Sequence, residues 1–271
     1  MSLKSSLIIK AGFKSAKTFL KESYFTAPLK VIDITEDKTG NPLRLMIMSS
    51  SPGVLDNDKY TINIDLEDNA SLWLTTQGYQ RIFKMKTDAC QEVSIKLGDH
   101  ASFVYLPHPV VPHEDADFTS INNIILRKNH RLIWSEIITC GRKHSGEVFK
   151  FKRYKNKTKI FIDGKLAVLE NVLLEPATRA VQAMGQLEGF SHQLSFIVLD
   201  NSKDMQLIAE EINNLLTLED DISFGTSALA VNGLMIRILG FKSEQLFKLQ
   251  NNIAELIAVS AQSSMPVEAL A

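Results

Sequence analysis

The motif LEDNASLWL at residues 66–74 recurs twice further along the chain, as LGDHASFVY at residues 97–105 and as LRKNHRLIW at residues 126–134. Each copy contains the apolar end of one strand, four or five turn-like residues and the apolar start of another strand. The leading leucines are 31 and 29 residues apart, and a looser copy, IDGKLAVL, begins 36 residues later at Ile162. Strand–turn–strand units at a nearly constant period are typical of stacked β architectures. The repeat therefore predicts a mainly β protein built of stacked sheets, solenoid-like or β-helical in form.

The sequence around these copies carries further strand and turn signals. Runs of alternating or β-branched residues occur at residues 43–48, 60–66 and 93–97. Turn signals rich in glycine, proline, asparagine and aspartate separate these runs. We expect residues 1–200 to form two facing sheets or a solenoid-like stack, and not a fold of alternating strands and helices.

The last third of the chain shows helical periodicity in two places. One helix is predicted for residues 204–218, with Ser202 or Asp204 as its N-cap. Its predicted apolar face consists of Leu207, Ile208, Ile212, Leu215 and Leu216. A second helix is predicted for residues 244–261, with Ser243 as its cap. The fold class is therefore mainly β with a few C-terminal α-helices.

Between the two helices, residues 223–239 are predicted to form a hairpin. Asn232 and Gly233 suit a type I′ turn, because both residues tolerate positive φ. We expect one β-rich domain over residues 1–261, made of a sheet body (1–200) and a helix–hairpin–helix portion (201–261). Residues 262–271 are predicted to be a flexible tail.

Composition limits the class of protein. The 271 residues are 45% hydrophobic and 23% charged, which is ordinary for a folded globular chain. The net charge of −1 gives no bulk attraction for nucleic acid. Cys90 and Cys140 are too few for a disulfide framework, and there is no apolar run of membrane-spanning length or signal peptide. These features predict a cytoplasmic protein.

The sequence has none of the common motifs of catalysis. A phosphate-binding loop followed by Lys-Ser/Thr is absent, as are HExxH, CxxC and GxSxG. The chain is therefore not itself a P-loop GTPase or ATPase, and catalysis of any kind becomes a weaker expectation.

Five stretches, taken in order, resemble the urease accessory protein family UreD, called UreH in some bacteria. They are SPGVLDND at residues 51–58, LWLTTQGYQRIF at 72–83, YLPHPVVP at 105–112, LIWSE with the following Gly-Arg and Gly-Glu pairs at 132–147, and the Asn-Gly hairpin at 225–240. The first stretch predicts a structural turn at Gly53, Asn57 and Asp58. Asn57 stands where the family has glycine, and asparagine is the next-best residue for positive φ.

The resemblance implies a maturation factor that is not an enzyme and has no intrinsic cofactor. Proteins of this family bind apo-urease and an accessory protein, UreF, and through UreF they recruit the GTPase UreG, which delivers nickel. The resemblance thus implies a UreF-like partner, a UreG-like GTPase and apo-urease within a hetero-oligomer, with nickel in transit. It also implies a β-rich fold with few helices. The lack of a membrane-spanning apolar run and the net charge of −1 separately predict neither membrane nor nucleic acid as a partner.

The densest group of metal-binding side chains follows the proline stretch. Imidazole from His108 and His113, with the carboxylates of Glu114, Asp115 and Asp117, would suit transient nickel. The alternative is a solvated acidic loop after Pro112, because the spacing of the histidines gives no fixed ligand geometry.

A second group consists of polar residues inside predicted strands. Its members are Asp65, Thr75, Gln77, Glu136 and Glu170. Carboxylates in a packed β core are costly unless they are paired or hydrated, so these residues predict a hydrated polar tunnel between the sheets through which a cation passes. The alternative is that they point outward or pair across strands on a sheet face.

Two further readings of the function stay open. Cys140 and His144, four residues apart and close to Glu136, would serve an unassigned β-helical enzyme, but nothing nearby supplies an oxyanion turn, and the sequence favours a buried structural thiol at Cys140. The other reading is a β-sheet binding module unrelated to urease.

Residues 150–159 hold six basic side chains and no acidic one, and Phe149, Phe151 and Tyr154 are interleaved with them. Basic and aromatic residues in alternation are typical of a surface that binds single-stranded nucleic acid. The same alternation fits an edge strand that lysines protect from pairing with another chain.

Overall fold

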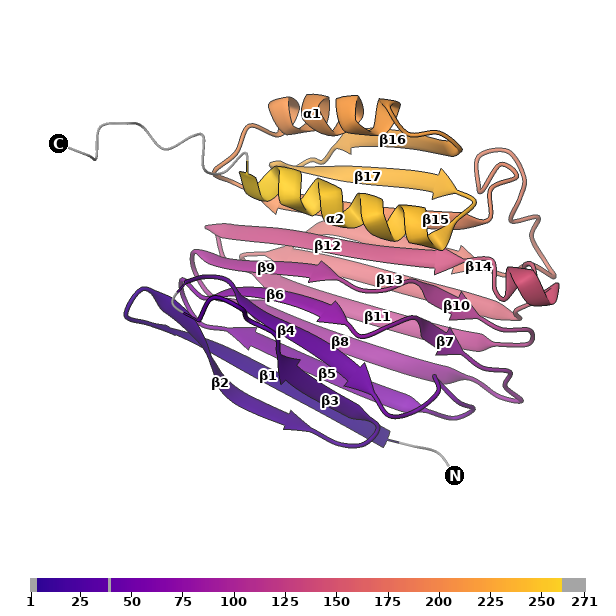
Figure 1. Cartoon of the computed structure of the whole chain (residues 1–271), viewed down its shortest axis with the longest axis horizontal. Coiled ribbons are helices and arrows are strands. Elements are labelled where there is room, and N and C mark those ends of the chain that lie inside the picture. The colour runs from indigo at the N-terminus through magenta and orange to yellow at the C-terminus, as the bar shows by residue number, and fades with distance from the viewer. Residues whose placement is uncertain (1–3, 39, 260–271) are drawn as a thin grey trace.

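The computed structural model describes residues 4–38 and 40–259, which form two facing β-sheets with two helices packed on one of them (Figure 1). Sheet A consists, in spatial order, of β14 (Lys165–Leu174), β13 (Arg153–Ile162), β11 (Asp117–Leu126), β8 (Ala89–Leu97), β5 (Lys59–Leu66), β1 (Lys4–Lys14) and β2 (Lys17–Phe25). Sheet B consists of β16 (Ile222–Ala228), β17 (Gly233–Gly240), β15 (His192–Asp200), β12 (His130–Thr139), β9 (Ala101–Leu106), β6 (Ser71–Thr76), β4 (Leu43–Ser49) and β3 (Leu29–Asp33). The short strands β7 (Gln80–Ile82) and β10 (Val110–Pro112) join sheet B at its side.

The middle of the chain winds between the two sheets as a β-helix does. Each repeat runs along sheet A, turns, and returns along sheet B: β5 to β6, β8 to β9, and β11 to β12. Because every coil passes in the same direction, β5, β8, β11 and β13 pair in parallel, and so do β4, β6, β9 and β12. The predicted solenoid-like stack of sheets is confirmed.

The fourth copy of the repeat behaves differently from the other three. Ile162 ends β13, and β14 returns antiparallel beside it in the same sheet. Asp163 and Gly164 both have positive φ, of 48° and 78°, as a tight two-residue hairpin requires. Two residues are too few to cross the roughly 10 Å between facing sheets, so this copy makes a hairpin and not another coil.

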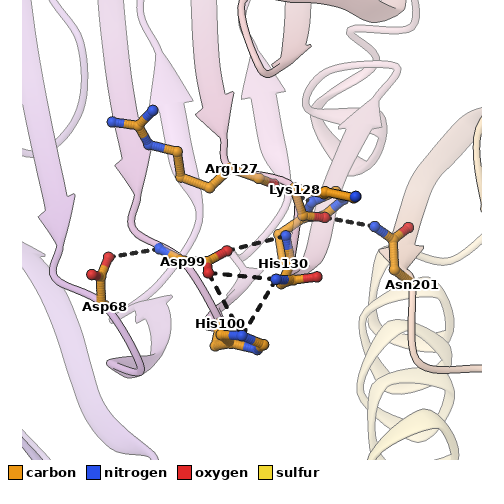
Figure 2. A network of polar contacts seen from close by, with 8 residues as sticks. Asp68, Asp99, His100, Arg127, Lys128, His130 and Asn201 are labelled. Carbon is orange, nitrogen blue, oxygen red and sulfur yellow. Dashed lines mark hydrogen bonds and ion pairs between the residues drawn. The ribbon is translucent and has the colours of Figure 1, made fainter.

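Polar side chains join the tight turns of successive coils (Figure 2). An Asp68 carboxylate oxygen accepts the backbone N–H of Asp99 at 2.7 Å, and Asp99 in turn accepts the backbone N–H of Asn129 at 3.3 Å. Asn201, after β15, donates to the Lys128 carbonyl at 2.6 Å. The turn residues of the repeat therefore satisfy backbone groups of the neighbouring coil.

Apolar side chains fill the space between the sheets at this turn end. The leading leucines Leu66, Leu97 and Leu126 are all buried there, and Leu66 pairs in register with Leu97. This core takes residues from both sheets. A second core lies on the outer face of sheet B, under the helices α1 (Met205–Thr217) and α2 (Ser243–Val259).

Both predicted helices form. Asp204 caps α1 by accepting the backbone N–H groups of Gln206 and Leu207. Leu207 was expected on the buried face but is 54% exposed, because the buried stripe runs through Met205, Ile208, Ile212 and Leu216, and a neighbouring residue lies about 100° around the helix. The predicted end of α2 at residue 261 and the tail at 262–271 lie outside the described residues.

The hairpin of β16 and β17 forms, but the predicted type I′ turn at Asn232 and Gly233 is wrong. Residues 229–232 make the connection, and the Asn232 amide donates to the carbonyls of Asp200 at 2.7 Å and Lys203 at 3.0 Å. Gly233 lies within β17, where a Cβ would stand 2.4 Å from the Val198 carbonyl oxygen. This glycine permits a close approach of strands and not a turn.

Among the helices of the described residues, none combines the length and the apolar character needed to cross a membrane.

Candidate functional site

A cavity of about 410 Å³ lies between the two sheets, away from the tight turns. Its walls come from the first residues of β5, β8, β11 and β13 in sheet A and from the last residues of β6, β9 and β12 in sheet B. Exposed residues, among them Gln77 and Tyr79, stand at its mouth together with Gly53. The stacking of coils therefore leaves a hollow where the apolar core stops.

The predicted turn shapes one side of this mouth. Asn57 has a φ of 66°, which confirms that asparagine adopts the left-handed conformation there. Asp58 is buried and accepts hydrogen bonds from the Leu55 backbone N–H at 2.8 Å and the Tyr60 hydroxyl at 2.9 Å. A Cβ on Gly53 would stand 2.4 Å from the Arg81 carbonyl oxygen, so glycine is needed where this loop contacts β7.

Part of the inner wall is polar, although apolar and aromatic side chains line more of the cavity. Asn122 of β11 is buried, and its amide nitrogen contacts oxygens of Asn156 at 2.8 Å, Thr158 at 2.9 Å and Glu136 at 3.3 Å. Ser120 donates to the Asn122 carbonyl oxygen at 3.3 Å. These side chains come from both sheets, so the polar network spans the gap between them.

Glu136 of β12 is the ionisable group on this wall. Burial, and then the negative charge of Glu170, raise its pKa to about 7 against the hydrogen bonds of Asn156 and Asn122. The buried Trp134 indole N–H makes no hydrogen bond within the described structure. The wall thus offers a carboxyl group that changes charge near neutral pH.

Glu170, on the edge strand β14 of sheet A, is held in a different way. It is buried on β14, and one carboxylate oxygen is 3.2 Å from a guanidinium nitrogen of Arg237 on β17. Its other oxygen has no partner among the described residues. Glu170 does not line the cavity; instead it joins sheet A to sheet B through an ion pair.

Of the five predicted tunnel residues, Glu136 and Gln77 line the cavity and the others do not. Asp65 was predicted wrongly, because it lies exposed on the outer face of sheet A, opposite the buried Ile64 and Leu66. Thr75 faces away from the cavity and donates to the Leu106 carbonyl at 2.8 Å. Its neighbour Thr76 lines the cavity instead, since successive strand residues point to opposite faces.

His108 stands at the mouth of the cavity. Its ring stacks on Phe247 of α2 with 4.2 Å between centroids, and its Nδ1 is 3.2 Å from the Thr76 hydroxyl. Burial lowers the pKa of His108, which favours the neutral imidazole, the form that binds metal ions.

His113 lies elsewhere, buried against Phe83 with 4.6 Å between ring centroids. The nearby acids are also engaged: Asp115 pairs with Lys84 at 2.6 Å, and buried Asp117 pairs with Lys152 and Arg153. Within residues 4–38 and 40–259, no three histidine, cysteine or acidic side chains gather as a metal site. The structure therefore does not bring His108 and His113 together.

Cys140 and His144 do not form a nucleophile and base. Cys140 is buried and burial raises the pKa of its thiol, whereas a nucleophilic cysteine needs a lowered pKa. His144 is exposed in the short 3-10 helix Lys143–Ser145. The expectation of a structural thiol accounts for these contacts.

Asn122 and Asn156 form much of the polar patch on the cavity wall, and neither was predicted from the sequence. Both are buried at inward positions of their strands. Asn122 is in register with Val93 and Ile62 of the neighbouring coils, and Asn156 is in register with Ser120. A polar residue at an inward position of the repeat would have indicated this wall. Recognising an inward position, however, requires the register between strands, which the sequence does not give.

The fold and the cavity define a class of protein: a β-helical scaffold with a hollow between its sheets whose wall carries a hydrogen-bonded polar patch. The family described as UreD urease accessory protein matches residues 4–268. A protein of Flavobacterium johnsoniae named urease accessory protein UreD is 43% identical over 259 residues, which cover 95% of this chain and 94% of that protein.

Proteins with the same name are 37% identical in Acetivibrio thermocellus, over 92% of this chain and 96% of the relative, and 36% identical in Haemophilus influenzae, over 95% and 99%. The chain belongs to the UreD urease accessory protein family. This membership supports a role in urease maturation and disfavours a β-sheet module unrelated to urease.

Proposed function

We propose that this chain is a non-catalytic maturation factor that passes nickel toward apo-urease through the cavity between its sheets. The observation that carries the proposal is the polar patch of Asn122, Asn156 and Glu136 on the cavity wall, inside a stack of sheets whose core toward the tight turns is apolar. In a protein with no passage, this buried carboxyl group would only lower stability, because its ionised form is strongly disfavoured away from water.

The donors along the cavity suit an ion that has to leave again. Amide, hydroxyl and carboxyl oxygens, with one imidazole from His108 at the mouth, are weaker nickel ligands than a set of histidines and thiolates. Because burial raises the pKa of Glu136 to about 7, its carboxyl group can ionise as the ion passes and compensate part of the ion's charge without forming a closed site. Nickel is cargo here and not a resident cofactor.

The proposal also names the partners. The chain would bind apo-urease and a UreF-like protein, and the UreF-like protein would recruit a UreG-like GTPase, all in the cytoplasm and within one hetero-oligomer. Family membership supports this assignment.

A plug at the cavity mouth tests the proposal. Gly78 lines the mouth, and a Cβ added there meets no atom within 4 Å, so Gly78→Phe places a ring at the entrance without a clash at Cβ. The matched control is Gly225→Phe on β16, where a Cβ also meets nothing and the cavity is not involved.

Both variants are to be expressed with urease and its accessory proteins, with nickel supplied. We expect Gly78→Phe to lower urease activation at least tenfold while thermal unfolding and binding to apo-urease and the UreF-like protein stay as in the native chain. Gly225→Phe should activate normally. Full activation by a folded Gly78→Phe variant would contradict passage through this cavity.

A further inference from the structure

The basic stretch at residues 150–159 lies neither on an edge strand nor among exposed aromatic rings. Strand β13, which contains most of it, is flanked by β11 on one side and β14 on the other. The edge-protection reading is therefore wrong, because β14 is the edge. Phe151 and Tyr154 are buried, so their rings are not available to stack on nucleic-acid bases.

Three lysines of β13 point out of the sheet at alternate positions. We call Lys155, Lys157 and Lys159 the lysine ridge. Lys152 and Arg153 at the start of the strand pair with buried Asp117, at 2.8 and 2.7 Å. The ridge lysines have no ion-pair partner anywhere in the described part of the chain.

The residues beside the ridge carry no negative charge. In register, the lysines stand between Thr119 and Leu173, between Ile121 and Asn171, and between Asn123 and Leu169. Alternate residues of a strand are about 6.7 Å apart, so three like charges lie in a row with no acidic side chain at the paired positions of either adjoining strand. Glu92, on the same face, is one strand further away, beyond β11.

Apolar side chains continue the same face. Ile125, Leu166 and Leu169 are 40%, 52% and 54% exposed, and Ile125 and Leu166 flank Phe161 in one cross-strand row. The helices α1 and α2 pack on sheet B (Figure 1), so neither covers this outer face of sheet A. Aliphatic side chains beside lysines suit a protein surface better than a nucleic acid.

We propose that the outer face of β11, β13 and β14 docks an acidic face of a partner protein. Carboxylates of the partner meet the lysine ridge, and apolar side chains cover Ile125, Leu166 and Leu169. Carboxylates four residues apart on a helix are about 6 Å apart, close to the spacing of the ridge, so an acidic amphipathic helix fits it. The inference rests on the proposed function in one respect, namely that the chain works inside an assembly.

The test compares two triple variants with equal loss of charge. One changes the lysine ridge, as Lys155→Gln, Lys157→Gln and Lys159→Gln. The control changes Lys30, Lys38 and Lys248 to Gln, which are exposed, lie in β3, in the loop after β3 and in α2, and make no ion pair in the described structure. Purified apo-urease, the UreF-like protein of the same organism and a single-stranded oligonucleotide serve as probes.

We expect the ridge variant to bind one of the two proteins at least tenfold more weakly at low salt, with a shallower salt dependence than the native chain. The control variant should bind within about twofold of the native chain. Unchanged binding of both proteins by a folded ridge variant would overturn the inference, and so would binding of the oligonucleotide in place of a protein.

This outcome is separate from that of the proposed function. The plugged Gly78→Phe variant keeps the docking face, so it should bind both proteins normally and still fail to activate urease. If the ridge variant binds and activates normally while Gly78→Phe fails, the docking inference falls and nickel passage stands. If Gly78→Phe activates normally while the ridge variant loses binding, nickel passage through the cavity falls and the docking inference stands.

Discussion

A carboxyl group enclosed between two sheets has to be neutral or compensated, and two glutamates of this chain show the two solutions. Glu170 is compensated by Arg237, which reaches it from the opposite sheet. Glu136 has only neutral hydrogen-bond donors around it, so burial raises its pKa to about 7. The ion pair joins the sheets, whereas the titrating group gives the cavity a charge that depends on pH.

The raised pKa of Glu136 predicts how stability depends on pH. The folded chain holds the Glu136 proton up to about pH 7, but the unfolded chain releases it near its ordinary pKa of about 4.3. The folded state therefore binds more protons between these values, and the free energy of unfolding falls as the pH rises through them.

Glu136→Gln removes this fall in the free energy of unfolding, because the glutamine amide does not titrate. We expect the variant to gain up to about 3 kcal/mol over the native chain at about pH 8, and little at about pH 4.5, as measured by urea unfolding. Glu92→Gln, on the exposed outer face of β8, is the control and should change little at either pH. An equal gain for Glu136→Gln at both pH values would show that the carboxyl does not titrate as described.

At the scale of single elements, leucines on different faces of one helix contribute differently to the stability of the fold. In α1, Leu216 is buried in the core beneath the helices and Leu207 is 54% exposed. Helix propensity treats the two leucines alike, so any difference between them measures packing against sheet B.

Leu216→Ala and Leu207→Ala form a matched pair within α1. We expect Leu216→Ala to lower the free energy of unfolding by about 3 kcal/mol through lost burial and a cavity, and Leu207→Ala by less than about 0.5 kcal/mol. Urea unfolding at neutral pH measures both. Similar losses would mean that α1 does not pack through the stripe described above.

For the whole molecule, the decisive feature is that one apolar core belongs to both sheets. Ile95 of sheet A and Leu72 of sheet B are both fully buried in it, and each coil of the chain crosses from one sheet to the other. The inner face of each sheet is buried only by the other sheet. We therefore expect the two sheets to unfold together.

Two substitutions on opposite sheets test this cooperativity. Ile95→Ala and Leu72→Ala should each lower the free energy of unfolding by about 2–5 kcal/mol. Both tryptophans, Trp73 and Trp134, lie in sheet B. Their fluorescence should therefore report the Ile95→Ala transition at the same urea concentration as far-UV circular dichroism. Two separate transitions in Ile95→Ala would contradict a shared core.

The local features of this protein could be predicted from its sequence. Strand alternation, the polar turns of the repeat and the Asp204 cap depend on neighbours within a few residues, and the structure has them where they were predicted. The left-handed conformation of Asn57 belongs to the same class, because it depends on the residue's own backbone preference.

The site, by contrast, depended on contacts between residues about thirty positions apart. Whether Thr75 or Thr76 faces the cavity is decided by the register of β6 between β4 and β9, and a shift of one residue reverses the face. The short loop at Asp163 and Gly164 turns β14 back along β13, which places the lysine ridge inside a sheet and not at its edge. Sequence alone determined which segments are strands, turns and helices, because those preferences are local. Only the tertiary structure decided which side chains share the cavity, because that depends on how distant strands pair.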